Sequence, residues 1–509
     1  MEFPSEFETS HKSFLIKKLQ GKSEHPTRLE FLYKLYLLEK NHKVKEIWIY
    51  LPPLNWTVSE YVEVYHLLEK IKNTGKTIHM FANEGGTGTL LLLSVANQST
   101  LGLHSEFNLM LPSVEPMFYG DFLKFWGVSV EAFASGPYKS FAESFTRSNF
   151  SKEAKKNISE LVENLQNYLL EILTKNGKIK KYHFFTPIHT SESLKSMGFI
   201  DKIETKKEWS NDESKFFKDS FLETYSYIKE FKIFPRKKSE IVILPLSGPI
   251  SGGDYSQKTR DSGKIESYSV IATLESLLEN KNVKAVILEI SSPGGSAFHS
   301  EQIYQAISTF REKKPITAYF KDTVASGGYY IAQGTSFITA NPVTVTGSIG
   351  AVMIRANLQK LYKKLKLNKE AIGFYPLREI QSEFVPLSKE SRSYLQKEIL
   401  RVEGLFYQRV SDGRQIPLES LNELGKGRVY LPKTENRIVD KIGGLLDSIQ
   451  HIKQELALKD INISYELPAY QFKNKIPIMG SLTEQFDNLS LLNEISYLTP
   501  FTIRFSNRR

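Results

Sequence analysis

One sequence pattern occurs twice in this chain, and the second copy follows the first at an offset of about 238 residues. In each copy, short runs of β-branched and other apolar residues alternate with stretches of helical periodicity. Ordered matches at a nearly constant offset indicate an internal duplication. Alternating strands and helices predict an α/β fold with a parallel sheet in each copy. The matched segments are 44–51 with 283–290, 59–72 with 300–310, and 76–82 with 314–320.

The duplication divides the 509 residues into four parts. A chain of this length exceeds what one hydrophobic core usually supports, so two or more domains are expected. The segment between the copies is rich in lysine and carboxylates and has a predicted helix at 219–230. The tail has no counterpart in the first copy, and we expect it to serve packing or assembly. The predicted parts are a first repeat at 1–203, a linker at 204–239, a second repeat at 240–456 and a tail at 457–509.

Composition excludes several kinds of site. The chain has no cysteine, which rules out disulfides, cysteine-ligated zinc and cysteine nucleophiles. Its net charge of +10 is spread along the sequence and is not gathered in a nucleic-acid-binding motif. The charge fits attraction to an anionic surface, membrane lipid included, and it fits a lysine-rich proteome equally well. No apolar run approaches the ~20 residues of a spanning helix, and the amino terminus resembles neither a signal peptide nor an anchor.

A serine lies in a tight turn between a strand and a helix of the second copy. The strand is predicted at 315–320, and the turn reads Ala325-Ser326-Gly327-Gly328. Glycines after the serine let backbone N–H groups approach a substrate, and the helix amino terminus adds the positive end of its dipole. Such a turn suits a serine nucleophile. The alternative is a serine that caps the helix, which is the commoner role at this position.

A second turn of the same kind lies about thirty residues upstream. Here Pro293, Gly294 and Gly295 separate the predicted strand at 283–290 from the predicted helix at 300–310. Consecutive strand–turn–helix units place their turns at the same carboxyl edge of a parallel sheet. The two glycines can therefore direct N–H groups into a cleft that both turns share. Donors in that arrangement form an oxyanion hole, which stabilises the charge that develops on an attacked carbonyl.

The two copies differ where a base is expected. The first copy has Lys139 in a segment for which the second copy has Arg378. An arginine keeps its proton in proteins, whereas a buried lysine can lose it. Lys139 could then deprotonate Ser326, whose counterpart in the first copy is Gly88. The alternative is a solvated surface lysine, which is the commoner state of this residue type.

Histidine offers an alternative base, and Ser348 offers an accessory group. His299 follows the Pro-Gly-Gly turn, while His104 and His183 lie in the first copy. A capping or surface role is commoner for a histidine at a helix start, such as His299. No histidine lies between Ser326 and His451, so a serine–histidine triad drawn from the second copy has little support. Ser348 follows a predicted strand, where it either orients the lysine amine or is an ordinary turn serine.

These motifs together resemble the long, duplicated form of signal peptide peptidase A. The similarity runs over about residues 44–455. That family consists of serine–lysine peptidases on a fold shared with crotonases and the Clp proteolytic subunit. The resemblance implies an α/β protein of two tandem ClpP/crotonase-like repeats of ββα units. The matching segments read Thr323-Val-Ala-Ser-Gly-Gly-Tyr-Tyr, Ser292-Pro-Gly-Gly-Ser, Thr346-Gly-Ser-Ile-Gly and Gly136-Pro-Tyr-Lys-Ser.

The resemblance also implies a role for each matching residue, with no metal or other cofactor. The nucleophile would be Ser326, the general base Lys139, the lysine-orienting group Ser348, the oxyanion hole Gly295 and Gly327, and the substrate contacts Gly294 and Gly328. The implied activity is that of a serine endopeptidase with a Ser–Lys dyad, which cleaves signal peptides and other extended apolar peptides.

The resemblance further implies a homo-oligomer, a tetramer being favoured, with the sites inside a ring or dome. Nucleic acid is not expected as a partner. Long-form relatives usually carry an amino-terminal membrane anchor, which the sequence of this chain does not show. Two expectations follow: either the start of the sequence is wrongly placed and misses an anchor, or the protein is soluble or peripherally bound to a membrane, with the cytoplasmic side as one location.

Two other functions fit parts of the pattern. A crotonase-like acyl-CoA hydratase or isomerase would use similar oxyanion turns together with catalytic carboxylates. Asp322 is the only acid close to the serine turn. A catalytically inactive scaffold that binds peptides would need neither nucleophile nor base. Binding of coenzyme A and labelling by a fluorophosphonate would separate these two functions from a peptidase.

Overall fold

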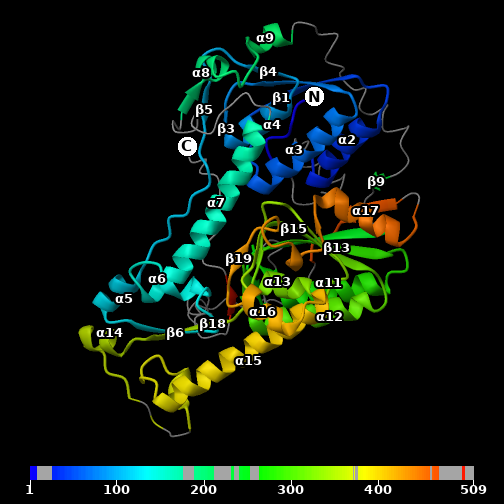
Figure 1. Ribbon diagram of the computed structural model, residues 1–509. Helices are drawn as coiled ribbons and strands as arrows, with labels where there is room; N and C mark the ends of the chain where they lie inside the picture. Colours follow the sequence, from blue (N-terminus) through cyan, green and yellow to red (C-terminus); the bar gives the residue numbers. More distant parts are fainter. Residues whose placement is uncertain are drawn as a thin grey trace, which may run out of the picture.

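The computed structural model shows two α/β units (Figure 1). The first unit, coloured from blue through cyan to bluish green, lies above the second unit, in green to orange. The helix expected at 219–230 and the candidate base His183 lie outside the described residues. The described residues are 1–7, 26–175, 188–210, 231–233, 240–252, 263–370, 372, 376–458, 461–468 and 496–498.

The first unit is built on a parallel sheet of four strands. The strands of this unit are β1 (Glu46–Leu51), β2 (Thr77–Ala82), β3 (Gly85–Gly86), β4 (Gln98–Leu101), β5 (Glu106–Asn108), β7 (Ile188–Thr190) and β8 (Lys202–Ile203). The parallel sheet has the order β1-β2-β4-β8, and a separate small sheet has the order β3-β5-β7. In β1, Ile47, Ile49 and Leu51 are buried at every second position, as expected for a strand with one face on the core.

Three helices of the first unit begin with the same hydrogen-bonded cap, formed by Thr27, Thr57 and Thr205. The helices are α2 (Arg28–Lys40), α3 (Val58–Asn73), α4 (Thr87–Val95), α5 (Gly120–Trp126), η1 (Ser140–Ala142), α6 (Glu143–Thr146), α7 (Lys152–Thr174), α8 (Ser191–Ser196) and α9 (Lys206–Trp209). Thr27 accepts from the backbone N–H of Glu30, and Thr57 accepts from that of Glu60. Each glutamate bonds back to the threonine backbone, which completes a capping box. These caps start α2 and α3 close to the residues that helical periodicity indicates.

The second unit repeats the strand order of the first, which confirms the tandem α/β arrangement. Its main sheet contains β9 (Phe231–Ile233), β10 (Ile241–Ser247), β13 (Ala285–Ser292), β15 (Ile316–Ala325), β16 (Ile338–Ala340), β17 (Val345–Gly347), β19 (Val429–Tyr430), β20 (Lys441–Ile442) and β21 (Ile461–Tyr465). β13, β15, β16 and β20 are parallel neighbours in that order, like β1, β2, β4 and β8. The sheet continues through β10 to β21, so the tail contributes a strand to it.

A second sheet of this unit joins parts of the chain that are far apart in sequence. It contains β12 (Ile265–Glu266), β11 (Ile250–Ser251), β14 (Gly294–Ser296), β22 (Ser496–Leu498), β18 (Val352–Asn357) and β6 (Ser129–Ala134), in this spatial order. β22 comes from the tail and β6 from the first unit. β6 runs antiparallel to β18, with partners from Ser129↔Asn357 to Ala134↔Val352. This pairing holds an arm of the first unit against the second unit, at the lower left of Figure 1.

Two long helices frame this arm. α7 descends to it from the first unit, and α15 runs beneath the second unit (Figure 1). The helices of the second unit are α11 (Ser267–Glu279), α12 (Ala297–Arg311), α13 (Gly327–Ala332), α14 (Gln359–Lys364), η3 (Arg378–Gln381), α15 (Lys389–Arg414), α16 (Leu418–Leu424), η4 (Asn436–Ile438) and α17 (Leu445–Glu455). Among the described residues, no helix has both the length and the apolar character that crossing a bilayer requires.

A buried ion cluster connects the two units. Arg28 of α2 donates to Glu63 of α3 and to Glu289 of β13, and its guanidinium lies 3.0 Å from Tyr319 Oη of β15. The side chains of Arg28 and Glu63 are only 6% and 3% exposed. Glu63 also accepts from the backbone N–H of Leu445 at 2.6 Å. Because the charges are desolvated, removing one of them leaves the others buried without a partner.

The substitution Arg28→Ala is expected to destabilise the folded protein strongly. It leaves two buried carboxylates without their cation, which typically costs about 3–5 kcal/mol. We expect Tm to fall by several degrees in a thermal melt followed by differential scanning calorimetry. The control is Lys433→Ala, which removes an ion pair with Glu171 whose side chains are 50% and 66% exposed. That pair should contribute less than about 1 kcal/mol, and an equal effect of both variants would argue against the cluster.

Candidate active site

Ser326 begins helix α13 without capping it. It follows β15 directly and occupies the N-cap position, but its side chain makes no cap hydrogen bond. Its backbone has φ = 56° and ψ = −122°, a region that residues with side chains rarely adopt. Two backbone hydrogen bonds of 2.8 Å hold the turn, from Ser326 N to Gly347 O and from Tyr330 N to Ser326 O. The hydroxyl is therefore directed away from the helix and is not the cap that serine usually provides.

Lys139 belongs to a loop that follows β6 and is packed on residues 426–428. Tyr138 N donates to Lys426 O at 3.1 Å. Gly427 has φ = 85°, and a side-chain carbon on it would lie 2.4 Å from Lys139 N. This glycine is required for the close approach of the two backbones. The loop therefore cannot shift without moving the segment beneath it.

The amine of Lys139 meets the hydroxyl of Ser326. Nζ lies 2.5 Å from Ser326 Oγ, 3.0 Å from Ser348 Oγ and 2.9 Å from Ser348 O. Lys139 is 3% exposed, Ser326 0% and Ser348 1%. A neutral amine has one lone pair and two N–H groups, so it can accept from Ser326 while it donates twice to Ser348. The structure thus brings together the three polar residues that the sequence singled out.

Burial lowers the pKa of Lys139 well below its ordinary value of 10.5, since a charged amine would lose its hydration there. The negative charge of Glu403 on α15 opposes this shift, but burial dominates. Glu403 is buried too, and burial raises its own pKa. A neutral amine is therefore available on Lys139 at a pH where an exposed lysine is almost fully protonated.

The two glycine turns meet beside Ser326. A side-chain carbon on Gly327 would lie 3.1 Å from the amide nitrogen of Gly295, so the two backbones are in close contact. Gly294 and Gly295 have φ values of 104° and 157°, which other residues rarely adopt. A side-chain carbon on Gly328 would lie 2.7 Å from a backbone carbonyl oxygen of the upstream turn. The four glycines expected at the site therefore lie together.

An extended segment of the tail lies next to these turns. β22 pairs antiparallel with β14, with partners from Gly294↔Leu498 to Ser296↔Ser496. On its other side it pairs with β18 through Val352↔Ser496. The space between β14 and β18 thus accommodates an extended backbone that adds a strand to the sheet.

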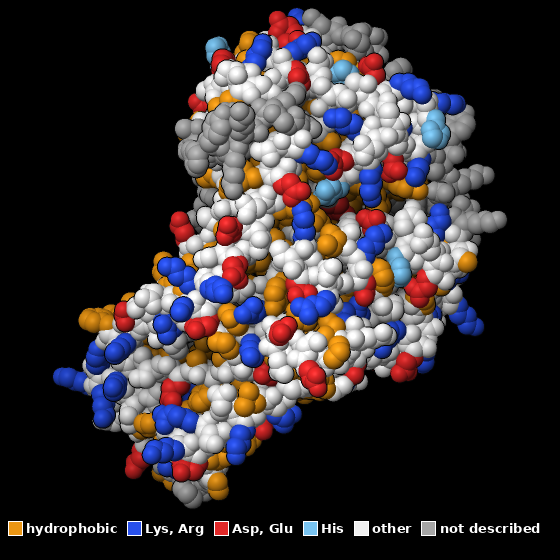
Figure 2. Space-filling model, in the orientation of Figure 1, with side chains coloured by type: hydrophobic (Ala, Val, Ile, Leu, Met, Phe, Trp, Pro, Cys, Tyr) orange, Lys and Arg blue, Asp and Glu red, His pale blue; other side chains and the backbone are white. Residues whose placement is uncertain are grey.

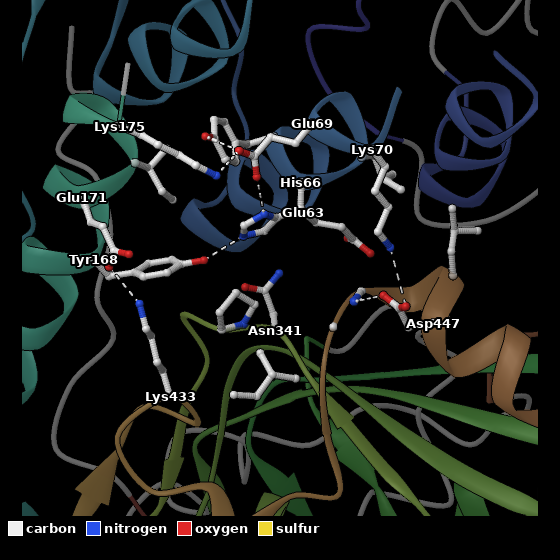
Figure 3. A pocket seen from close by; sticks show the side chains of 18 of the residues that line it. Glu63, His66, Glu69, Lys70, Tyr168, Glu171, Lys175, Asn341, Lys433 and Asp447 are labelled. Atoms are coloured by element: carbon white, nitrogen blue, oxygen red, sulfur yellow. Dashed lines mark hydrogen bonds and ion pairs between the residues drawn. The ribbon is translucent and has the colours of Figure 1, made fainter. Parts of the chain in front are cut away.

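A separate pocket of about 630 Å³ lies between the two units, and neither Ser326 nor Lys139 lines it. Most of its charged side chains are paired with one another, as Figure 3 shows, whereas Glu63 pairs with Arg28 outside the pocket. His66 lies 3.1 Å from Glu69 and 2.7 Å from Tyr168. Further ion pairs are those of Lys175 with Glu69, Lys70 with Asp447 and Lys433 with Glu171. In the part of the chain that the structure describes, no group of His, Asp and Glu side chains could hold a metal ion.

Comparison with known proteins places the chain in a family. The model of peptidase family S49 matches residues 112–219 and 308–459, just over half of the chain. The chain belongs to peptidase family S49. A putative protease of Synechocystis sp. is 35% identical over 222 residues, which cover 43% of this chain and 75% of that protein.

Two longer matches extend over both units of this S49 chain. The chloroplastic serine protease SPPA of Arabidopsis thaliana is 28% identical over 429 residues, which cover 81% of this chain and 63% of that protein. Protease 4 of Haemophilus influenzae is 26% identical over 432 residues, which cover 78% of this chain and 69% of that protein. The S49 chain therefore matches slightly less than two thirds of the length of the Arabidopsis relative.

The histidines considered as alternative bases make their contacts elsewhere in the S49 chain. His299 Nδ1 lies 2.9 Å from Gln302 Oε1 and 3.1 Å from Ser267 Oγ. His104 is exposed on the surface, and its Nδ1 lies 3.8 Å from Glu192. These two histidines have the local and surface roles that the sequence made more probable for them.

Glu403 is a site residue of the S49 chain that the sequence did not reveal. It accepts from Tyr407 Oη at 3.4 Å, and that oxygen in turn accepts from Lys426 N at 3.1 Å. It also forms a hydrogen bond with Ser135, at the end of β6. Glu403 thus contacts Ser135 directly and is connected to Lys426 through the Tyr407 hydroxyl. No sequence signal distinguishes it, because α15 carries charged residues along its whole length.

The reaction of Ser326 with a fluorophosphonate should depend on the protonation of Lys139. The labelling rate is expected to rise with pH as the amine loses its proton and to level off well below pH 10.5, because burial lowers this pKa. The measurement is the rate of labelling across about pH 5 to 10, spanning the range over which a perturbed lysine titrates. A midpoint at the pKa of an ordinary lysine would contradict a neutral Lys139.

The substitution Glu403→Gln tests the charge that acts on this amine. Removing the negative charge should lower the pKa of Lys139 further and move the midpoint of labelling to lower pH. The matched control is Glu398→Gln, on the same helix, where the carboxylate is 30% exposed and pairs with Arg401. The control should leave the midpoint unchanged.

Proposed function

We propose that this S49 chain is a serine endopeptidase in which Ser326 is the nucleophile and Lys139 the general base. The observation that carries the proposal is the contact of 2.5 Å between Lys139 Nζ and Ser326 Oγ in a buried site. Membership of family S49 and the protease names of the relatives support it. A serine hydroxyl is a weak nucleophile, and an adjacent base within hydrogen-bond reach is what activates it.

Acylation follows from this geometry. Lys139 Nζ takes the proton of Ser326 as Oγ forms a bond to the carbonyl carbon of the substrate. The carbonyl oxygen then carries the negative charge, and in this proposal the N–H groups of Gly295 and Gly327 hold it. When the C–N bond breaks, the ammonium of Lys139 returns the proton to the leaving amine. Ser348 keeps the amine oriented through its carbonyl and hydroxyl oxygens.

Deacylation repeats these steps with water as the nucleophile. Lys139 takes a proton from the water that attacks the acyl-enzyme, and the ester bond to Ser326 Oγ then breaks. Oγ recovers its proton from the lysine, and the carboxylic acid leaves. One amine thus serves both halves of the reaction, and it must be neutral at the start of each half.

The substrate in this proposal is an extended peptide that lies between β14 and β18, as β22 of the chain itself does. Backbone hydrogen bonds to two strand edges can bind any extended peptide, because they use groups that every peptide backbone has. Leftover signal peptides and other apolar peptides, the substrates that the family resemblance implies, are of this kind. A homo-oligomer, with a tetramer favoured, is the assembly that we propose for the enzyme.

The acyl-CoA enzyme is the weaker alternative. It requires a carboxylate directed at the reacting carbon, and Asp322 was the acid that the sequence offered. In the structure Asp322 accepts from Ser59 Oγ at 2.6 Å and lies 3.8 Å from Lys321, at the contact with the first unit. An inactive scaffold would leave Ser326 unlabelled by a fluorophosphonate, which separates it from the peptidase.

Removal of either member of the dyad should abolish peptidase activity. We expect Ser326→Ala and Lys139→Ala each to lower kcat/KM for an apolar peptide by about a thousand-fold or more. The matched controls are Ser448→Ala and Lys76→Ala, a buried serine and a buried lysine outside the site. Hydrolysis is followed by chromatography of the products. Turnover at the wild-type rate in either dyad variant would refute the proposed chemistry.

The substitution Gly295→Ala should impair oxyanion binding. The added carbon would lie 2.2 Å from Ile250 O, so the turn must move and its N–H group would lose its direction. Loss of one oxyanion donor typically lowers kcat about 100–1000-fold. The control is Gly404→Ala in α15, where a side-chain carbon meets nothing within 4 Å. A Gly295→Ala enzyme with unchanged kcat and Tm would exclude this amide from catalysis.

A further inference from the structure

The two short helices α5 and α14 form a tip at the end of the arm. They are joined through the pairing of β6 with β18, because α5 precedes β6 and α14 follows β18. Leu361 N donates to Gly127 O at 3.1 Å, directly after α5. Lys364 Nζ lies 5.2 Å from the ring centroid of Phe125, a cation–π contact between the helices. Elements from both units therefore hold the tip in one shape.

The tip carries large apolar side chains that the described chain leaves uncovered. Neither α5 nor α14 has a buried residue. Phe122, Phe125 and Trp126 are 60%, 70% and 47% exposed, and Leu365 and Leu367 beyond α14 are each 55% exposed. The Trp126 ring lies 5.6 Å from that of Phe125 and 6.5 Å from that of Phe122, so the aromatic residues form one patch. Contiguous patches of this kind mark interaction sites, whereas single exposed apolar residues do not.

Lysines surround this aromatic patch. Figure 2 shows basic side chains beside hydrophobic ones at the lower left end of the molecule, where Figure 1 places α5 and α14. Lys369 is neutralised by its pair with Glu383. Asp121 and Glu370 are the exposed acids of these two segments. The lysines outnumber them, and the exposed ones are Lys124, Lys360, Lys363, Lys364 and Lys366.

We propose that the tip binds the surface of a bilayer that contains anionic phospholipid. Aromatic rings favour the headgroup region, where their apolar bodies leave water, and lysines beside them gain from the negative surface potential. This combination needs no spanning helix. An isologous two-fold dimer through the tip fits the surface less well, because the tip would then contact itself and bring lysines against lysines.

The test is flotation of the full chain with vesicles of two compositions. Vesicles of phosphatidylcholine with about 30% phosphatidylglycerol should carry the protein to the top of the gradient, and pure phosphatidylcholine should bind it far more weakly. Binding should fall when salt is raised from about 0.1 M to about 0.5 M, because salt screens the lysines. Trp126 emission should shift to the blue on binding, and Trp126→Phe should remove that shift.

Two pairs of variants separate the aromatic and basic contributions. The double variant Phe122→Ser and Phe125→Ser should lose vesicle binding, while Leu103→Ser and Ile188→Ser, at exposed apolar residues of the first unit, should not. Lys360→Gln and Lys363→Gln should each lower vesicle affinity about five-fold. The matching control is Lys281→Gln with Lys313→Gln, at exposed lysines of the second unit.

Two results would overturn the proposal. One is an absence of binding to the anionic vesicles, or equal binding of the tip variants and the wild type. The other is a wild-type oligomer in which Trp126 already emits as a buried residue without vesicles, and which the tip variants dissociate in sedimentation experiments. In that case the tip is a contact between copies of the chain. Peptide hydrolysis in solution is measured alongside, because the lipid contact and the Ser–Lys dyad can fail independently.

Discussion

The candidate site depends on the register of one strand pair, β6 with β18. Lys139 lies five residues beyond the end of β6, and a slip of two residues would move it by about 7 Å. A slip of one residue would turn every side chain of β6 to the opposite face. The register is secured beyond the strand end, since Ser135 N donates to Ala351 O at 3.0 Å and Ala351 N donates to Ser135 Oγ at 2.9 Å. The distance of 2.5 Å between Lys139 Nζ of the first unit and Ser326 Oγ of the second thus depends on these backbone hydrogen bonds.

The basic side chains inside this protein have two kinds of partner, carboxylates or neutral oxygens. The kind of partner decides whether the side chain keeps its proton. Lys321 lies 2.7 Å from Glu60, and although burial alone lowers its pKa, the carboxylates of Glu60 and Asp322 raise it above the ordinary value. Arg28 is held by two carboxylates in the same region. Lys139 instead meets hydroxyl and carbonyl oxygens, so burial lowers its pKa. The charged pairs join the units, whereas the amine that contacts hydroxyl and carbonyl oxygens can exchange a proton.

Short motifs made much of this site predictable. The strand–turn–helix pattern around Ser326 and the glycines of the upstream turn follow from local sequence, and the comparison of the two copies pointed to Lys139. Three features could not be predicted from the sequence, because they arise only in the folded chain. The positive φ of Ser326, which frees its hydroxyl from capping, has no sequence signature. Glu403 becomes a neighbour of the lysine loop only through the packing of α15. The place of β22 depends on a pairing across about two hundred residues.

The first unit does not repeat the proposed serine nucleophile, and the packing there gives the reason. Glycine stands both at the aligned position, Gly88, and at the cap of α4, Gly86. A side-chain carbon on Gly88 would lie 2.4 Å from the ring of Tyr61, whose Oη donates to Leu54 O at 2.9 Å. That ring fills the space where a hydroxyl would have to stand. The base is not duplicated either, because an arginine stands at the matching place of the second unit and cannot give up its proton. In the proposed dyad each unit therefore supplies one member, so the proposed chemistry requires both units to fold together.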